Sequence, residues 1–400
     1  MPCPYAKSFA ALFAALASLA ANSGGAGAQT VTPYATIPSG HVTYLGPGRG
    51  HQDDLPAGDV RIGLLIPLTG PRKPEGEAIL AAARIALEEC KAPGVSLAVG
   101  DETASPWGPT ADALIHLVMD DQVIAIITSE SGAVAHLTEQ VGNRIGVPVL
   151  TLATDATTTE INLRWLFRLA PSDAAQARAF VDDIYSKRLF TRVLLVTARD
   201  HDGRAGASEF LAAVRNAGAP TPSTFTVDTQ KPDLDAWPAA LKQASPQAVV
   251  FWTSAPIASA LRSRMHSPAP GVKLYLSQAT ADGYEEPDAY FSQTSDRISG
   301  SQAWTVASRR VESDLARRFS ELYRAKVQAN PCPAALAAFD AVGLICDGLQ
   351  KSGPNRARLR DRLAEVTAYS GASGVISFDN QGNNQQPLRL VPVDLPTSRE

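Results

Sequence analysis

Residues 60–67 read VRIGLLIP, and this apolar run decides the fold that the sequence predicts. It has the length of a strand and no polar alternation, which is typical of a strand buried on both faces of a parallel sheet. Helices are expected at 78–90 and 110–119, and further strands at 95–100 and 123–128. Short apolar strands that alternate with helices of this length indicate βαβ units.

The same alternation continues along the chain. A helix at 133–145 and a strand at 147–152 complete one half, and the rhythm restarts after Pro171. Further helix–strand pairs are expected at 174–188 with 192–197, 205–216 with 224–227, 234–243 with 248–252, and 257–265 with 272–276. Helices near 312–329, 334–351 and 356–368 precede strand-like pieces at 374–378 and 388–393. The sequence therefore predicts an α/β protein with two similar halves.

Length and composition exclude several classes of protein. The chain has 400 residues, of which 45% are apolar and 19% charged, so it is neither disordered nor a coiled coil. A single hydrophobic core stops growing at about 250–300 residues, so two domains are expected. The net charge of −4 offers no basic surface for nucleic acid and no polybasic patch for a membrane.

The N-terminus has the layout of a secretory signal peptide at residues 1–28. Lys7 precedes an apolar run at 9–21, and small residues at 26–28 are suited to cleavage. The apolar run is shorter than the roughly 20 residues that a helix needs to cross a bilayer. We therefore expect a mature chain that begins near Gln29, acts outside the cytoplasm and does not insert directly into the membrane.

Export permits disulfide bonds. Removal of the signal peptide leaves Cys90, Cys332 and Cys346, an odd number. Because Cys90 and Cys346 each fall on a predicted helix, buried thiols are the favoured interpretation. A single bridge with Cys90 or Cys346 as a member is the alternative. No pair has the CxxC spacing of a metal site.

Small polar residues follow two of the predicted strands. Strand 123–128 ends at Thr128-Ser129-Glu130-Ser131-Gly132, where a helix begins at once, and the next strand ends at Thr151-Leu152-Ala153-Thr154-Asp155. Free backbone N–H groups and the helix dipole favour an anion at such a helix start. Ligands of open α/β sheets bind at the carboxyl ends of strands, so these two ends could hold a carboxylate. The alternative is that these Ser and Thr side chains are ordinary helix caps.

Catalytic and metal sites have weaker support. Ser129 and Ser131 lack the first Gly of the G-x-S-x-G nucleophile elbow, and the histidines form no H-x-x-x-H or H-E-x-x-H pattern. His116 and His136 fall within predicted helices, so surface or packing roles are expected. The adjacent ligand types Asp200-His201-Asp202 cannot easily converge on one ion. We therefore expect no enzyme activity, no metal and no other cofactor.

Seven segments carry a resemblance to a known family. They are RIGLLIPLTGP at 61–71, IAIITSESG at 124–132, GVPVLTLATDATTTE at 146–160, FRLAPSDAAQARAF at 167–180, RVLLVTARDHDGRAG at 192–206, AFDAVGLICDGLQKSG at 338–353 and GASGVISFDNQGN at 371–383. In this order, across roughly residues 60–393, the chain resembles the periplasmic binding proteins of the type I fold that serve branched-chain amino acid ABC transporters.

The resemblance implies two Rossmann-like lobes with parallel sheets, joined by three crossovers, and a small-molecule ligand in the cleft between them. The first lobe would comprise residues 59–171 and 305–375, and the second lobe 172–304 and 376–400, after an extended lead-in at 29–58. Closure would be a hinge motion in the periplasm, and the closed form would dock on an ABC transporter permease in the inner membrane.

The family's site can be carried over by position. In the first lobe, ligand-binding residues are expected at Thr69, Ser129, Ser131, Gly132, Ala153, Thr154 and Asp155, with the ligand carboxylate at Ser131 and Gly132. In the second lobe they are expected at Asp202 and Gln278. Trp252, at the end of a predicted strand, is the tryptophan expected to face a ligand.

Two departures from the family bear on the ligand. Relatives often have a Tyr that covers the ligand where this chain has Asp202, and an acid for the ligand ammonium in the region where it has Gln278. Asp282 is the closest acid there. Asp202 or Asp155 could replace the missing partner. Alternatively, the ligand could be an amide, a urea-like molecule, a small organic acid or an aromatic acid.

Three functional hypotheses follow. The leading one is a non-enzymatic solute-binding receptor of an ABC importer that binds an amino acid or a related amide or carboxylate. The second is a ligand-binding subunit of a sensory system with the same fold. The third, an exported α/β hydrolase, is disfavoured by the missing nucleophile elbow.

Overall fold

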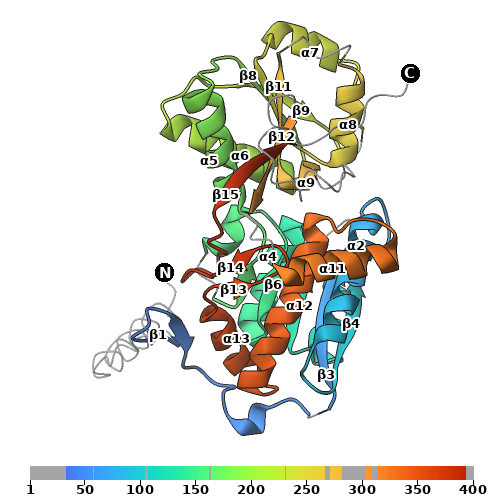
Figure 1. Ribbon diagram of the computed structural model, residues 1–400, viewed down its shortest axis with the longest axis vertical. Coiled ribbons are helices and arrows are strands. Elements are labelled where there is room, and N and C mark those ends of the chain that lie inside the picture. Colours follow the sequence, from blue (N-terminus) through green and yellow to red (C-terminus); the bar gives the residue numbers. More distant parts are fainter. Residues whose placement is uncertain are drawn as a thin grey trace, which may run out of the picture.

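The computed structural model describes residues 33–56, 58–103, 107–161, 164–229, 231–265, 271–281, 303–308 and 313–392. The expected signal peptide and Asp282 lie outside these residues. The chain forms two α/β lobes stacked along the long axis of the molecule (Figure 1). Within the described ranges, every helix is too short or too polar to cross a membrane.

The first lobe is built on a five-stranded parallel sheet of order β4-β3-β5-β6-β7. Its strands are β3 (Val60–Ile66), β4 (Val95–Asp101), β5 (Ala125–Thr128), β6 (Val149–Thr151) and β7 (Leu166–Arg168). Ile62, Leu64 and Ile66 point to one face of the sheet and Leu65 to the other, and all four are fully buried. Burial on both faces accounts for the unbroken apolar run of VRIGLLIP.

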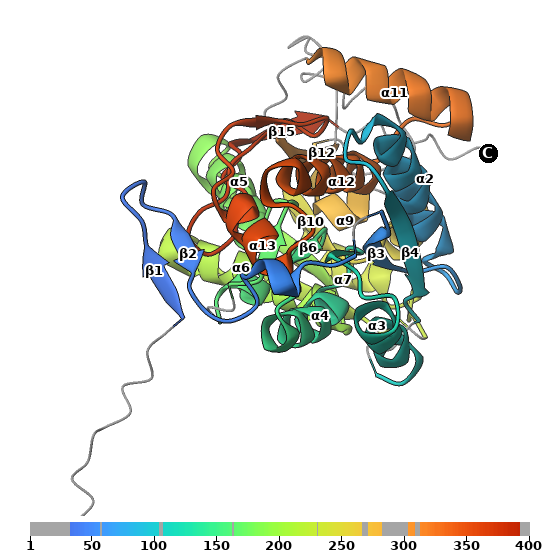
Figure 2. The ribbon, with the colours of Figure 1, turned by 90° about the horizontal axis from the view of Figure 1, so that it is seen from below.

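Helices cover both faces of this sheet, as Figure 2 shows. One face packs against α2 (Lys73–Glu89), α12 (Pro333–Ser352) and α13 (Arg356–Ala364), and the other against α3 (Pro109–Met119) and α4 (Gly132–Ile145). Helix α11 (Asp314–Val327), the 3-10 turn η3 (Ala156–Thr159) and the hairpin of β13 (Tyr369–Ser370) and β14 (Val375–Ile376) complete the lobe.

The second lobe contains a six-stranded sheet of order β15-β12-β11-β10-β8-β9. Its strands are β8 (Val193–Ala198), β9 (Ser223–Val227), β10 (Ala248–Trp252), β11 (Lys273–Leu276), β12 (Ala303–Ser308) and β15 (Leu388–Pro392). Its helices are α5 (Asp173–Val181), the π-helix η4 (Asp182–Lys187), α6 (His201–Asn216), α7 (Trp237–Ala244), α8 (Ala255–Ser263) and α9 (Gln278–Ala281). All neighbouring strands pair in parallel except β12 and β15, which are antiparallel.

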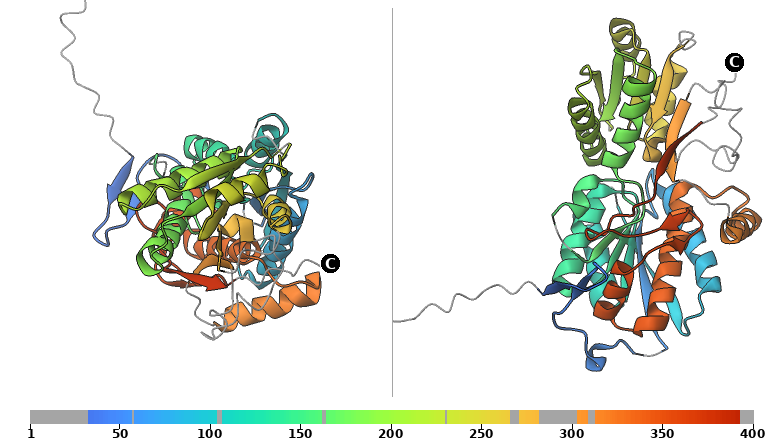
Figure 3. Two further views of the ribbon diagram at one scale, coloured as in Figure 1. Left: turned by 90° about the horizontal axis from the view of Figure 1, so that it is seen from above. Right: turned by 60° about the vertical axis from the view of Figure 1, so that its left-hand side comes forward.

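The described elements pass between the lobes three times. The crossings lie between β7 and α5, between β12 and α11, and between the first-lobe contacts near Asn383 and β15. Figure 3 shows β15 returning to the second lobe. The expected fold class is confirmed. The expected boundary at 304/305 falls inside β12, and the one at 375/376 precedes residues that still pair with the first lobe.

A disulfide joins Cys90, at the end of α2, to Cys346 in α12. These two helices pack together on the same face of the first sheet. The favoured prediction of buried thiols is therefore wrong for this pair, and the alternative of one bridge is correct. The bridge links positions 256 residues apart, so it ties the start of the first lobe to the segment that returns to it late in the chain.

The expected extended lead-in is instead partly folded. Strands β1 (Tyr34–Thr36) and β2 (Val42–Tyr44) form an antiparallel hairpin that packs on the first lobe, and the 3-10 turn η2 (His51–Asp53) follows. The Tyr44 ring meets Trp165 edge-on, and the buried carboxylate of Asp361 accepts hydrogen bonds from Thr43 and from the Tyr44 backbone. A short Gly/Pro-rich stretch can form such a hairpin when a neighbouring lobe supplies its packing.

Candidate functional site

The carboxyl ends of β5, β6 and β7 lie level with one another in the first sheet. Thr128 is paired with Thr151, and Thr151 with Arg168. The Thr128 hydroxyl donates to the Thr151 hydroxyl at 2.8 Å, so the two strand ends are directly linked. The polar residues that follow these strands therefore gather at one edge of the sheet, the edge that faces the second lobe (Figure 1).

The N-terminus of α4 is capped from within the chain. Ser131 is the N-cap residue, and its hydroxyl accepts from Val134 N at 3.4 Å. The backbone N–H of Ser131 donates to the Ser129 hydroxyl at 3.2 Å. The next N–H, that of Gly132, donates to Asp202 Oδ1 of the second lobe at 3.0 Å. The cap interpretation thus holds for Ser131, and the helix start also binds a carboxylate, which belongs to the protein itself.

Asp202 reaches the first lobe because α6 begins at His201, four residues before the expected start. Asp200 is the N-cap and accepts from Gly203 N at 2.8 Å. The side chain of Asp202 is half-buried, and burial raises its pKa to about 6 despite nearby Arg72 and His201.

Gly132 permits this close contact between the lobes. A Cβ at position 132 would lie 2.7 Å from Asp202 Oδ1 and 2.8 Å from Asp155 Cβ. Both distances are shorter than ordinary van der Waals contacts. Any other residue here would displace the Asp202 carboxylate from the start of α4.

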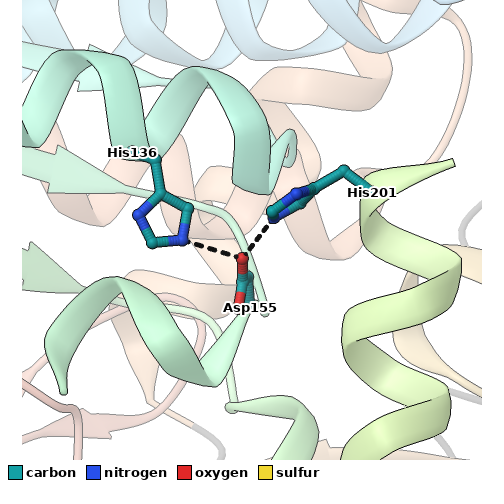
Figure 4. A group of neighbouring side chains, drawn as sticks. All are labelled: His136, Asp155 and His201. Atoms are coloured by element: carbon teal, nitrogen blue, oxygen red, sulfur yellow. Dashed lines mark hydrogen bonds and ion pairs between the residues drawn. The ribbon is translucent and has the colours of Figure 1, made fainter.

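Asp155 is held firmly at the start of η3. Its Oδ1 accepts from the Thr157 backbone N–H at 2.9 Å and from the Thr157 hydroxyl at 2.7 Å, and Arg168 donates to its backbone carbonyl. Its Oδ2 lies 3.2 Å from His136 Nε2 and 2.6 Å from His201 Nε2 (Figure 4). Burial alone would raise the pKa of Asp155, but the hydrogen bonds from the histidines and Thr157 lower it overall.

This arrangement corrects one expectation. His116 is exposed and pairs with Asp120, as expected for a surface histidine. His136 is instead half-buried, belongs to the Asp155 cluster and faces His201 from the second lobe, with the ring centroids 5.6 Å apart. The position of His136 within a predicted helix could not reveal its contacts with Asp155 and His201, because those two residues belong to separate elements.

A second polar cluster surrounds Arg72, just before α2. The guanidinium contacts Glu75 at 2.8 Å and Glu102 at 2.7 Å, and lies 3.4 Å from the Ser129 hydroxyl. Ser129 itself donates to Glu102. Burial raises the pKa of Glu102 to about 7 even though Arg72 and Ser129 lower it. Sequence reasoning missed Arg72, Glu75 and Glu102, although Glu102 follows β4 directly and its strand-end position could have identified it.

Three predicted residues of the first lobe have structural partners of their own. The hydroxyl of Thr69 is exposed and donates to Asp101 Oδ2 at 2.8 Å. Ala153 is fully buried and its N–H donates to the Thr151 hydroxyl at 3.1 Å. The backbone carbonyl of Thr154 accepts from Asp173 N at 2.7 Å, which fixes the start of α5. These contacts shape the edge of the sheet.

The predicted residues of the second lobe differ in their surroundings. Trp252 is 4% exposed and packs against Phe180 and Phe210, while its indole N–H donates to Asp173 Oδ1 at 3.2 Å. It therefore belongs to the core of the lobe. Gln278 is buried at the start of α9, and its side-chain oxygen has no hydrogen-bond partner among the described residues.

The interlobe site is rich in carboxyl groups. It combines the two clusters with the buried carboxylate of Asp173, whose pKa burial raises to about 7 despite the bond from Trp252. Its carboxyl groups are Glu75, Glu102, Asp155, Asp173 and Asp202, and its basic side chains are Arg72, Arg168, His136 and His201. A group that brings positive charge would relieve the repulsion among these carboxylates.

Two Rossmann-like lobes with a polar site between them define a two-lobed solute-binding protein. The family model described as periplasmic binding protein matches residues 59–399, so the chain belongs to this family. The family consists of solute-binding proteins, in agreement with the expectation that this chain is not an enzyme. No curated relative matches the chain in sequence.

Solved structures share the fold. A leucine-binding protein from Thermotoga maritima has a TM-score of 0.71 at 19% identity, over 84% of this chain and 98% of that one. A branched-chain amino acid transporter substrate-binding protein from Streptococcus pneumoniae, in complex with isoleucine, has a TM-score of 0.70 at 19% sequence identity. The match covers 84% of this chain and 100% of that one. An ABC transporter solute-binding protein from Rhodopseudomonas palustris BisB5, in complex with 3,4-dihydroxybenzoic acid, has a TM-score of 0.71 at 18% sequence identity. The match covers 84% of this chain and 93% of that one.

Proposed function

We propose that this protein is the periplasmic receptor of an ABC importer and binds a small zwitterionic solute, an amino acid, between its lobes. The observation that carries the proposal is the contact between Asp202 Oδ1 and the Gly132 N–H. It pairs a carboxylate of one lobe with a helix N-terminus of the other. A zwitterion offers the complement of each partner.

The ligand would enter between these two groups. Its carboxylate would take the place of Asp202 at the Gly132 N–H, where the helix dipole favours a negative group. Its ammonium would then pair with the displaced carboxylate of Asp202. The lobes would part here far enough to admit the ligand, and their direct contact would become a contact bridged by the ligand.

Asp202 is better suited than Asp155 to hold the ammonium. Both oxygens of Asp155 already accept hydrogen bonds, from Thr157 on one side and from two histidines on the other. Asp202 Oδ2 has no hydrogen-bond partner among the residues that the structure describes, while Oδ1 is used by Gly132. One oxygen therefore remains available for a ligand donor.

The acidity of the site supports an amine-bearing ligand over a simple aromatic acid. Solved structures of similar fold hold leucine-type amino acids in some cases and dihydroxybenzoate in another. A benzoate brings only negative charge to a site with five carboxylates, whereas an ammonium group compensates one of them. A site with this charge should discriminate strongly between the two classes.

A thermal-shift screen tests this function. The panel contains zwitterionic amino acids, amino amides and amine-free carboxylates such as benzoate. A ligand at a hundredfold excess over its Kd should stabilise the wild type by about 2.7 kcal/mol. Asp202→Asn should reduce this stabilisation to about 0.4–1.4 kcal/mol, whereas Asp182→Asn, which changes an exposed acid of the same lobe, should keep it. Stabilisation by amine-free carboxylates alone would contradict the proposal.

Export and delivery to a permease form part of the same proposal. The predicted signal peptide at residues 1–28 supports a periplasmic location, and the family supports an ABC transporter partner. N-terminal sequencing of protein secreted by a bacterial host should find a start near Gln29. Uptake into vesicles that carry a permease should require the loaded receptor, and signalling without uptake would favour the sensory alternative.

A further inference from the structure

Two histidines and an aspartate from different parts of the chain converge between the lobes (Figure 4). His136 lies on α4 and Asp155 at the start of η3, both in the first lobe, while His201 is the first residue of α6 in the second. Their candidate ligand atoms all lie within 4.8 Å of one another. The Nε2 atoms of both histidines point at the same carboxylate oxygen, Asp155 Oδ2.

The donor set and its spacing suit a divalent transition metal ion. Zn²⁺ binds imidazole nitrogen and carboxylate oxygen at about 2.0–2.2 Å, so ligand atoms in a tetrahedral site lie about 3.3 Å apart. The distance from His136 Nε2 to Asp155 Oδ2 is 3.2 Å, and that from His201 Nε2 is 2.6 Å. A shift of His201 by less than 1 Å would bring its distance from Asp155 to this value. Three protein ligands would leave one position for water.

An independent feature points to the same ion. Glu139, one turn along α4 from His136, is fully buried, and neither of its carboxylate oxygens has a hydrogen-bond partner among the described residues. Its Oε2 lies 3.6 Å from His136 Nδ1. Metal-binding histidines usually donate their second ring N–H to a carboxylate, which orients the ring and strengthens the ligand. Glu139 is placed for this role.

We infer that His136, Asp155 and His201 form a binding site for a divalent transition metal ion of the Zn²⁺ class, supported by Glu139. His201 is the only one of these ligands in the second lobe, so the ion would join the lobes. His136 and His201 are both partly exposed, which gives the ion a route from solvent. Bound metal would favour the closed arrangement of the lobes, because an open arrangement would separate His201 from the other two ligands.

The metal ion and the solute are assigned different protein groups, but His201 and Asp202 are neighbours on α6, so binding of one changes the lobe spacing that the other requires. The zwitterion is assigned to Asp202 and the Gly132 N–H, neither of which is a proposed metal ligand. The two proposals are tested separately. Solute binding by metal-free protein concerns the site at Asp202, and metal binding without solute concerns the three metal ligands.

Equilibrium dialysis against Zn²⁺ tests the metal site, with metal-free protein that carries no polyhistidine tag. We expect one Zn²⁺ per wild-type chain. His136→Gln, His201→Gln and Asp155→Asn should each weaken binding by at least about 100-fold, and Glu139→Gln by about 10-fold. His116→Gln is the matched control, because His116 is an exposed histidine beside Asp120 and Asp121 that lies away from the cluster. It should bind like the wild type.

Substitution with Co²⁺ adds a readout that needs no variant. Co²⁺ in the wild type should show the intense visible absorption of a tetrahedral site with nitrogen ligands, and Zn²⁺ should abolish it by competition. Absence of stoichiometric Zn²⁺ would overturn the inference. Equal losses in His116→Gln and His201→Gln, or weak octahedral Co²⁺ bands alone, would show surface binding and overturn it as well.

Discussion

Asp202 Oδ1 and the backbone N–H of Gly132 are joined by a 3.0 Å hydrogen bond that runs from one lobe to the other. The bond places a carboxylate at the N-terminus of α4, where a helix favours negative charge. It therefore marks both where a ligand anion would bind and which side chain it would displace. Several predictions depend on this contact and on the elements that hold it in place.

Gly132→Ala should open the lobes without unfolding either one. The added Cβ would meet Asp202 Oδ1 at 2.7 Å and Asp155 Cβ at 2.8 Å, so the Asp202 carboxylate would leave the Gly132 N–H and the lobes would lose this contact. Small-angle scattering should show a larger radius of gyration than in the wild type. Gly142→Ala is the control on the same helix, because its Cβ meets Val147 O inside the first lobe. It should lower stability and leave the lobe spacing unchanged; expansion in both variants would contradict the account.

Loss of the disulfide should destabilise the first lobe. The Cys90–Cys346 bridge closes a loop of 256 residues, and disulfides usually contribute about 2–4 kcal/mol by restricting the unfolded chain. The double variant Cys90→Ala/Cys346→Ala should show this loss in urea unfolding. Reductant should produce the same loss in the wild type and no further change in the variant. An unchanged wild-type midpoint under reductant would argue against the bridge.

Asp361→Ala should detach the β1–β2 hairpin from the first lobe. The buried carboxylate accepts from Thr43 and Tyr44 at 2.8 Å and pairs with the buried Arg360 at 2.9 Å. Its removal leaves Arg360 without this counter-charge, which should cost about 3 kcal/mol.

Limited proteolysis near residue 45 should therefore be faster in Asp361→Ala. Asp314→Ala removes an exposed acid that pairs with Arg317, so it should change stability by less than about 0.5 kcal/mol and leave the proteolysis rate alone. Equal effects of the two substitutions would show that Asp361 does not anchor the hairpin.

Asp173 should make the protein less stable as the pH rises from about 4 to about 7. Burial raises the pKa of its carboxyl to about 7 in the folded chain, above the value of about 3.9 in an unfolded one. The folded state therefore binds the proton more tightly than the unfolded state. The resulting stabilisation is complete below the unfolded pKa and is lost above the folded pKa.

Asp173→Asn mimics the protonated acid and should flatten this pH dependence of the free energy of unfolding, by up to about 1.4 kcal/mol per unit of pKa difference. Urea unfolding at several pH values measures the effect. An identical slope for wild type and variant would show that Asp173 does not titrate in this range.

Much of the fold could be predicted from residue patterns. The unbroken run VRIGLLIP indicated a strand covered on both faces, and the alternation after it indicated two α/β halves. The polar ends of 123–128 and 147–152 were expected to be neighbours, and the pairing of Thr128 with Thr151 places them side by side. Local patterns are informative here because strand type and strand burial follow directly from side-chain periodicity.

The start of α6 was harder to predict because two glycines interrupt the helical pattern. A Cβ on Gly203 would lie 2.6 Å from Ala198 O, and one on Gly206 only 1.8 Å from Trp252 Nε1. Both glycines are thus explained by close packing against the sheet, which a single sequence does not reveal. Asp200 was the available signal, since an Asp often precedes a helix as its N-cap.

The contacts between lobes could not be inferred from spacing. His136, Asp155 and His201 come from three elements and meet only when the lobes pack together.

Long-range contacts within the first lobe could not be inferred either. Arg72 and Glu102 lie 30 residues apart and meet because β3 and β4 are neighbours in the sheet. The disulfide likewise joins helices that are distant in sequence. Such contacts depend on tertiary packing, which periodicity alone does not determine.

The most direct test of the account is titration calorimetry of the best zwitterionic ligand from the screen, with the wild type, Asp202→Asn and Asp182→Asn. We expect one site per chain, with affinity reduced by about 10- to 100-fold in Asp202→Asn, as expected for a lost charge-assisted hydrogen bond, and unchanged in Asp182→Asn. Equal affinity in the wild type and Asp202→Asn would contradict the assignment of the ligand to the contact between Asp202 and Gly132.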